Sequence, residues 1–129
     1  MRNKFLGTGE PGYNPVRKLA IILSGLRFAV VYDLSVAYKV ILSAAVLVFS
    51  FAYRAWMDFL LVLVVTALML AAEIFNSALE AVCDYLQTDE DQKIKAIKDM
   101  AAAATGVCIL AWLLVIVFET LNLFGWRLA

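Results

Sequence analysis

Four polar side chains that could do chemistry recur at helical spacing inside the segment 72–99, which lies between two long apolar runs. They are Glu73, Asn76, Glu80 and Asp84. At about 100° per residue in an α-helix, all four project from one face. An ionisable side chain at membrane depth costs on the order of 3 kcal/mol on insertion scales and seldom faces lipid. These four residues, the polar stripe, are therefore expected to face protein, water, a cation or a ligand.

Three hypotheses account for the polar stripe. In the first, its carboxylates pair with Lys or Arg and hold a helical bundle together. In the second, Glu73 and Glu80 form a proton or cation relay, as intramembrane carboxylates often do. In the third, the carboxylates hold Mg²⁺ on nucleotide phosphates, one of them takes a proton from a hydroxyl, and Lys98 neutralises phosphate charge. The residue types alone leave all three open.

The composition restricts the class of protein. The 129 residues suffice for one domain, and 64% hydrophobic with 17% charged residues is too apolar for an ordinary soluble one. The net charge of zero provides no basic field for nucleic acid, so we expect no nucleic-acid partner. The chain has no His, and Cys83 and Cys108 form no metal-binding motif. We therefore expect an integral membrane protein with two reduced, structural thiols.

Three apolar runs predict three membrane-spanning helices and hence an all-α fold. The predicted spans are residues 35–53, 57–85 and 100–124. Lys39 is the only charge of the first span, and its long side chain is expected to reach the headgroups. At about 1.5 Å per residue, the second span exceeds a hydrocarbon core of about 30 Å. Its acidic end is thus expected near or beyond one membrane face, followed by a charged connector over 87–99.

The N-terminal region predicts an arm and a surface helix. Residues 1–13 combine three Gly and a Pro with scattered charges, which is typical of a flexible arm. Asn14 followed by Pro15 is a helix start, so a helix is expected over 14–32. Its polar side carries Arg17, Lys18, Ser24 and Arg27. This pattern suits an amphipathic helix in the membrane interface, and an extension of the first span is the alternative.

The distribution of basic residues predicts the orientation. Most of them precede or open the first span or lie in the connector: Arg2, Lys4, Arg17, Lys18, Arg27, Lys39, Lys93, Lys95 and Lys98. Arg54 and Arg127 stand alone on the other side. The positive-inside rule then places the N-terminus and the connector in the cytoplasm and the C-terminus outside. The polar stripe would end on the side where ATP is available.

Two segments resemble the small prokaryotic diacylglycerol kinases. They are AEIFNSALEAVCD, residues 72–84, and IKDMAAAA, residues 97–104. The family signature has two glutamates, an Asn, an Asp and a Lys-Asp pair at the same separations, and the resemblance extends over about 25–106. Gly25–Arg27 followed by Asp33 is also similar to the family. The sequence carries no Walker A, Gly-rich kinase loop or HRD motif, which fits a family whose phosphotransfer chemistry is built differently.

The resemblance implies a homotrimer of three-span subunits, each with an amphipathic surface helix, in the bacterial cytoplasmic membrane. Such an enzyme transfers the γ-phosphoryl group of ATP, with Mg²⁺, to a lipid alcohol. Subunit association is also expected because three spans cannot shield the polar stripe alone. Diacylglycerol is favoured as acceptor because NSALEAV and KDM are similar to those members. Undecaprenol is the alternative, and a carboxylate-lined ion or proton pathway without catalysis is the alternative from another class.

Residue roles follow from the resemblance position by position. Glu73 matches the general base that contacts the lipid hydroxyl. Glu80 matches the metal-holding glutamate, and Asp33 matches the second metal carboxylate, which is usually Glu in the family. The nucleotide-binding candidates are Asn76, Asp89, Lys98 and Asp99. Asp89 has a solvated charged turn as its alternative. Ser24 and Arg27 are candidate substrate-binding residues because the surface helix could cover the site and admit a lipid from the side.

Overall fold

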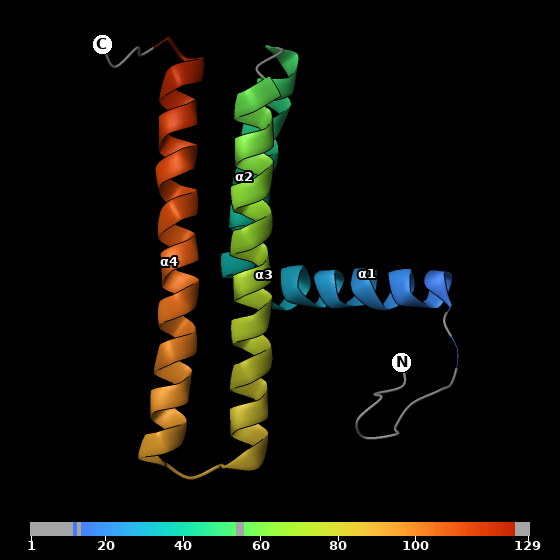
Figure 1. The fold of residues 1–129 in the computed structure, drawn as a ribbon, viewed down its shortest axis with the longest axis vertical. Coiled ribbons are helices and arrows are strands. Elements are labelled where there is room, and N and C mark those ends of the chain that lie inside the picture. Colours follow the sequence, from blue (N-terminus) through green and yellow to red (C-terminus); the bar gives the residue numbers. More distant parts are fainter. Residues whose placement is uncertain (1–11, 13, 54–55, 126–129) are drawn as a thin grey trace. The chain divides into compact units, whose positions relative to one another are not determined.

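The computed structural model describes residues 12, 14–53 and 56–125, and the regular structure in these residues is entirely α-helical. Four helices follow one another along the chain (Figure 1). They are α1 (Pro15–Tyr32), α2 (Leu34–Ala52), α3 (Trp56–Leu86) and α4 (Gln92–Leu123). The chain divides into two compact units, Met1–Ala37 and Tyr38–Ala129, and we describe each by itself.

Helices α2, α3 and α4 are long and apolar enough to cross a membrane, which confirms the prediction of three helices able to span one. Many of their large apolar side chains are exposed, among them Leu68, Leu113 and Leu114. In water this surface would be unfavourable, whereas lipid or another subunit can cover it. The described part of the chain is therefore that of an all-helical membrane protein.

Helix α1 begins where the sequence predicts. The Asn14 Oδ1 accepts hydrogen bonds from the backbone N–H groups of Val16, at 3.1 Å, and Arg17, at 3.2 Å. Pro15 occupies the first helical turn, where it has no hydrogen bond to lose. No α1 residue is buried, and the placement of α1 on the membrane surface stays a prediction. Apart from Gly12, the predicted arm 1–13 lies outside the described residues.

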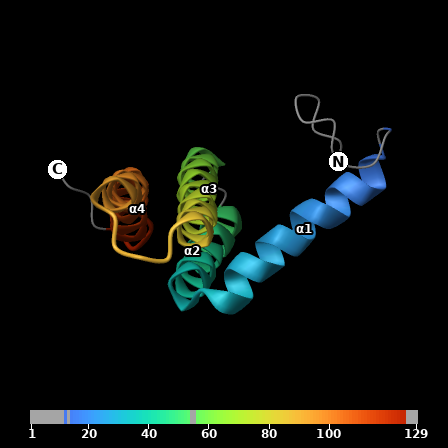
Figure 2. The same ribbon diagram turned by 90° about the horizontal axis from the view of Figure 1, so that it is seen from below.

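Helices α3 and α4 run side by side in opposite directions within the second unit (Figure 1, Figure 2). Their apolar faces meet α2 in one core, formed by Val46, Val62, Val65, Met69, Trp112 and Ile116. A buried hydrogen bond ties α2 to α4, because Trp112 Nε1 donates to Ser43 Oγ at 2.8 Å. This core holds the three spans in register and thereby positions the polar stripe.

Helix α4 starts earlier than the apolar run suggests. Asp91 caps its N-terminus, where Asp91 Oδ1 accepts from the N–H groups of Lys93, at 2.8 Å, and Ile94, at 3.1 Å. The cap allows the helix to begin at Gln92, so most of the predicted connector 87–99 is helical. The apolar run from Met100 marks where α4 becomes lipid-compatible, not where it begins.

Candidate active site

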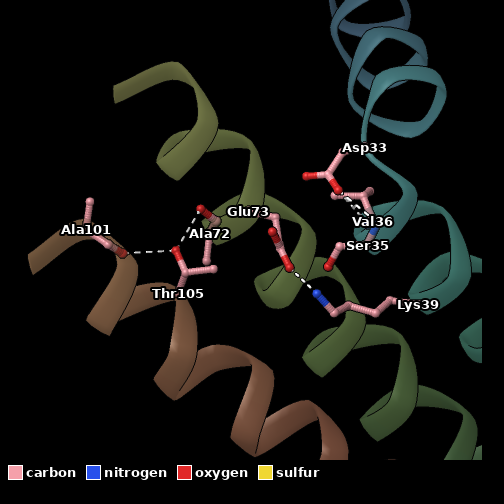
Figure 3. A network of polar contacts seen from close by, with 8 residues as sticks. All are labelled: Asp33, Ser35, Val36, Lys39, Ala72, Glu73, Ala101 and Thr105. Carbon is pink, nitrogen blue, oxygen red and sulfur yellow. Dashed lines mark hydrogen bonds and ion pairs between the residues drawn. The ribbon is translucent and has the colours of Figure 1, made fainter. Parts of the chain in front are cut away.

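Glu73 lies on α3 and is almost fully buried, with 7% of its surface exposed. Its Oε1 forms an ion pair with the Nζ of Lys39 on α2 (Figure 3). Lys39 is also buried, at 3% exposed, so the prediction that its side chain reaches the headgroups is wrong. The side chain turns inward because pairing with a carboxylate offsets the large cost of taking either charge out of water.

The position of Glu73 along α3 sets its depth. At about 1.5 Å per residue, Glu73 is about 26 Å from Trp56 at the start of the helix. A hydrocarbon core is about 30 Å thick, so a span that starts near one face brings Glu73 close to the other. The rest of the polar stripe continues in the same direction, toward the α3–α4 connector.

Helix α4 approaches α3 closely beside Glu73. The hydroxyl of Thr105, a buried residue, donates to the carbonyl oxygens of Ala101, at 3.0 Å, and Ala72, at 3.3 Å (Figure 3). Ala72 is the residue before Glu73 in the same helix. The backbone that carries Glu73 is thus held by α4, while its carboxylate is held by α2.

Asn76 and Glu80 form the next part of the polar stripe. Asn76 Nδ2 donates to Glu80 Oε1 at 3.0 Å, one helical turn along α3. The other polar atom of the amide, Asn76 Oδ1, is buried and finds no hydrogen-bond partner among the described residues. A buried polar atom without a partner is costly, which makes this oxygen a candidate ligand atom.

The oxygens of Asn76 and Glu80 fit a divalent cation of the magnesium kind. Within residues 12, 14–53 and 56–125, no group of three or more His, Cys, Asp or Glu forms a ready metal cage. Mg²⁺ does not need one, because it is commonly held by one or two carboxylates together with substrate phosphates and water. A carboxylate and an orphaned amide oxygen on one helix face therefore suit a cation that arrives with a nucleotide.

The last residue of the stripe pairs with the predicted phosphate-binding lysine. Lys98 Nζ of α4 donates to Asp84 Oδ1 of α3 at 2.6 Å. The two side chains are 33% and 67% exposed, so water reaches the pair. Lys98 therefore stands at the end of the polar stripe with a protein carboxylate as its partner, and its phosphate-binding role stays a prediction.

A cleft of about 630 Å³ opens beside this pair, where α3 and α4 are joined. Four acidic and two basic residues line it: Asp84, Asp89, Glu90, Asp91, Lys95 and Lys98. Its size is in the range of small-molecule sites. Of the predicted nucleotide-binding residues, Asp89 and Lys98 line the cleft, whereas Asn76 and the exposed Asp99 do not.

Asp33 has a structural role that the sequence hypothesis missed. Its Oδ1 accepts from the N–H groups of Ser35, at 2.8 Å, and Val36, at 3.4 Å, and so caps α2 (Figure 3). Asp is a better helix N-cap than Glu because its shorter side chain reaches the first turn. Capping thus explains an Asp here without a metal, and the metal role of Asp33 stays a prediction.

The remaining candidates, Ser24 and Arg27, belong with Asp33 to the unit Met1–Ala37. Both are exposed on α1. Their substrate-binding role stays a prediction.

A second buried glutamate lies apart from the polar stripe. Glu119 of α4 is 3% exposed and has Asp58 and Asn122 as neighbours. Asp58 lies in the first turn of α3, at the opposite end of that helix from the cleft. Glu119 therefore provides a buried carboxyl group that can serve as a control for the stripe.

Comparison with models of protein families gives a match to the family "Prokaryotic diacylglycerol kinase" over residues 20–122. The matched range contains every candidate site residue from Ser24 to Asp99. No curated protein and no solved structure gave a significant match.

Proposed function

The chain belongs to the prokaryotic diacylglycerol kinase family, and we propose that it phosphorylates diacylglycerol with ATP and Mg²⁺ to give phosphatidic acid. Family membership makes it a lipid kinase, and its three apolar helices make it a membrane protein. One arrangement supports the finer proposal: the buried Glu73 carboxylate is followed on the same face by the Asn76–Glu80 pair and then by the cleft at Lys98.

In the proposed reaction, the lipid hydroxyl oxygen forms a bond to the γ-phosphorus of ATP. The bond from this phosphorus to the β–γ bridging oxygen breaks, and ADP leaves with its electron pair. The hydroxyl proton passes to the carboxylate of Glu73. The products are a lipid phosphate monoester and ADP, with the proton finally released to water.

Charge in the cleft favours a nucleotide that is bound together with a cation. Four acidic side chains against two lysines would repel a bare triphosphate. Glu80 and Asn76 Oδ1 would hold Mg²⁺, which when bound supplies positive charge to the phosphates. Lys98 can exchange Asp84 for a phosphate oxygen at little cost, because an exposed ion pair is only weakly stabilising.

A lipid panel tests the function. Purified protein in detergent is incubated with γ-labelled ATP, Mg²⁺, and either diacylglycerol or undecaprenol. We expect labelled phosphatidic acid. Labelled polyprenyl phosphate in its place would assign the alternative acceptor, and absence of any labelled lipid would reject the kinase proposal in favour of an ion or proton pathway without catalysis.

The proposal includes a homotrimer, which a measurement of the native mass of the active enzyme can check.

We also propose that the cleft faces the cytoplasm. A Thr88→Cys variant, exposed at the cleft, should react with a membrane-impermeant thiol reagent only from the cytoplasmic side. The matched variant Phe124→Cys, exposed at the other end of α4, should react only from outside. The unaltered chain measures the background of Cys83, which is buried, and Cys108, which is half-buried. If the impermeant reagent, added outside intact cells, labels Thr88→Cys, the proposed orientation is wrong and the cleft is separated from ATP.

A further inference from the structure

Lys39 is the only charged residue of α2, and it reaches across to α3 to pair with Glu73. Both members are at least nine-tenths buried. Such a pair adds little net stability, because the cost of removing two charges from water largely cancels their attraction. The placement of this costly pair on the proposed base therefore calls for a reason other than stability.

We infer that Lys39 is a positioning residue for Glu73: it holds the carboxylate by Oε1 and leaves Oε2 to accept the proton of the lipid hydroxyl. This inference rests on the proposed function. An ammonium group has donors and no acceptor, so Lys39 cannot itself take the hydroxyl proton while it is charged. Its effect on the reaction must pass through Glu73.

The surroundings show how the carboxylate is held. The Lys39 Nζ lies 5.6 Å from the centre of the Tyr38 ring, where the ring face favours a cation. On the other side of α3, the Thr105 hydroxyl contacts the carbonyl oxygen of Ala72, next to Glu73. Glu73 is thus braced by α2 through its side chain and by α4 through its backbone. Without Lys39, the Glu73 carboxylate would lose the contact that holds it, and only the backbone beside it would stay braced.

The charge of Lys39 matters as much as its reach. An isolated ion is strongly disfavoured in an apolar environment, so the buried Glu73 carboxylate needs a counter-charge. Lys39 supplies that charge against Oε1.

The test compares Lys39→Gln and Lys39→Arg with the wild-type chain in purified, detergent-solubilised form. Gln keeps hydrogen bonding without charge, and we expect kcat to fall about 10²-fold, the scale of a misplaced catalytic group. The KM values for ATP and diacylglycerol should change little, because neither substrate is bound by Lys39. Arg retains the charge in a different shape, so the kcat of Lys39→Arg should lie between those of the wild-type chain and Lys39→Gln.

Ser43→Ala is the matched control on the same helix. It removes the buried hydrogen bond to Trp112 and should lower thermal stability while kcat per folded enzyme is retained. Wild-type kcat in folded Lys39→Gln would overturn the inference. If Lys39→Gln does not assemble, Lys39→Arg decides: a lowered kcat supports positioning, and an unchanged kcat rejects it. A wild-type chain that phosphorylates no lipid would instead reject the proposed function itself.

Discussion

The double variant Lys39→Met/Glu73→Gln is expected to assemble as the wild-type chain does but to turn over about 10²–10⁴ times more slowly. The size of the loss is that of removing a general base. Assembly should survive because replacing a buried ion pair by neutral side chains of similar volume is often neutral or stabilising. Initial rates at saturating ATP, Mg²⁺ and diacylglycerol, normalised to the folded fraction from size-exclusion chromatography, measure the effect.

The double variant is needed because the single variant Glu73→Gln is ambiguous. It leaves Lys39 buried without its counter-charge, which costs about 3–5 kcal/mol in comparable cases. Lost activity could then reflect a failure to fold. In the double variant both charges are absent, so loss of turnover in a folded chain reports on chemistry alone.

A purely structural ion pair predicts a different outcome. The single variant would lose assembly, whereas the double variant would recover both assembly and near-wild-type turnover. That result would remove Glu73 from the base assignment and make Asp99, the exposed carboxylate after Lys98, the next residue to examine.

The helices could be predicted because their signals are local. Apolar runs mark α2, α3 and α4 in the sequence, and Asn14 with Pro15 marks the start of α1. The start of α4 was predicted too late because the charged residues before Met100 have no membrane signal, although Asp91 carries a capping signal. The same local signal at Asp33 would have shown the cap of α2.

The candidate site was only partly predictable because its contacts join distant segments. Helical spacing places Glu73 and Glu80 on one face, but Lys39 is 34 positions away from its partner Glu73. Whether Lys39 reaches the headgroups or turns inward depends on how α2 is rotated about its axis, which sequence spacing does not specify. The ion-pairing hypothesis is confirmed at Glu73 by its contact with Lys39, whereas the role of Glu73 as a base in phosphotransfer stays a prediction.

The orphaned oxygen of Asn76 was likewise beyond sequence reasoning. Spacing predicts that Asn76 lies near Glu80, but only the hydrogen bond from Nδ2 shows which amide atom is left over. That atom makes the pair a candidate half-site for a cation, to be completed by substrate phosphates and water.

Glu80→Gln should separate metal binding from proton transfer. The Gln carbonyl oxygen can still accept from Asn76 Nδ2, so the local geometry should survive while one negative charge is lost. We expect the Mg²⁺ concentration for half-maximal rate to rise at least about 10-fold, in line with altered metal sites, and saturating Mg²⁺ to restore part of the rate. Kinase rates over a Mg²⁺ titration at fixed ATP measure this change.

Glu119→Gln is the control, at a buried glutamate away from the stripe, and it should leave the Mg²⁺ dependence unchanged. If Glu80→Gln shows the same Mg²⁺ dependence as the wild-type chain, Glu80 does not hold the metal, and its hydrogen bond would then serve only to orient Asn76.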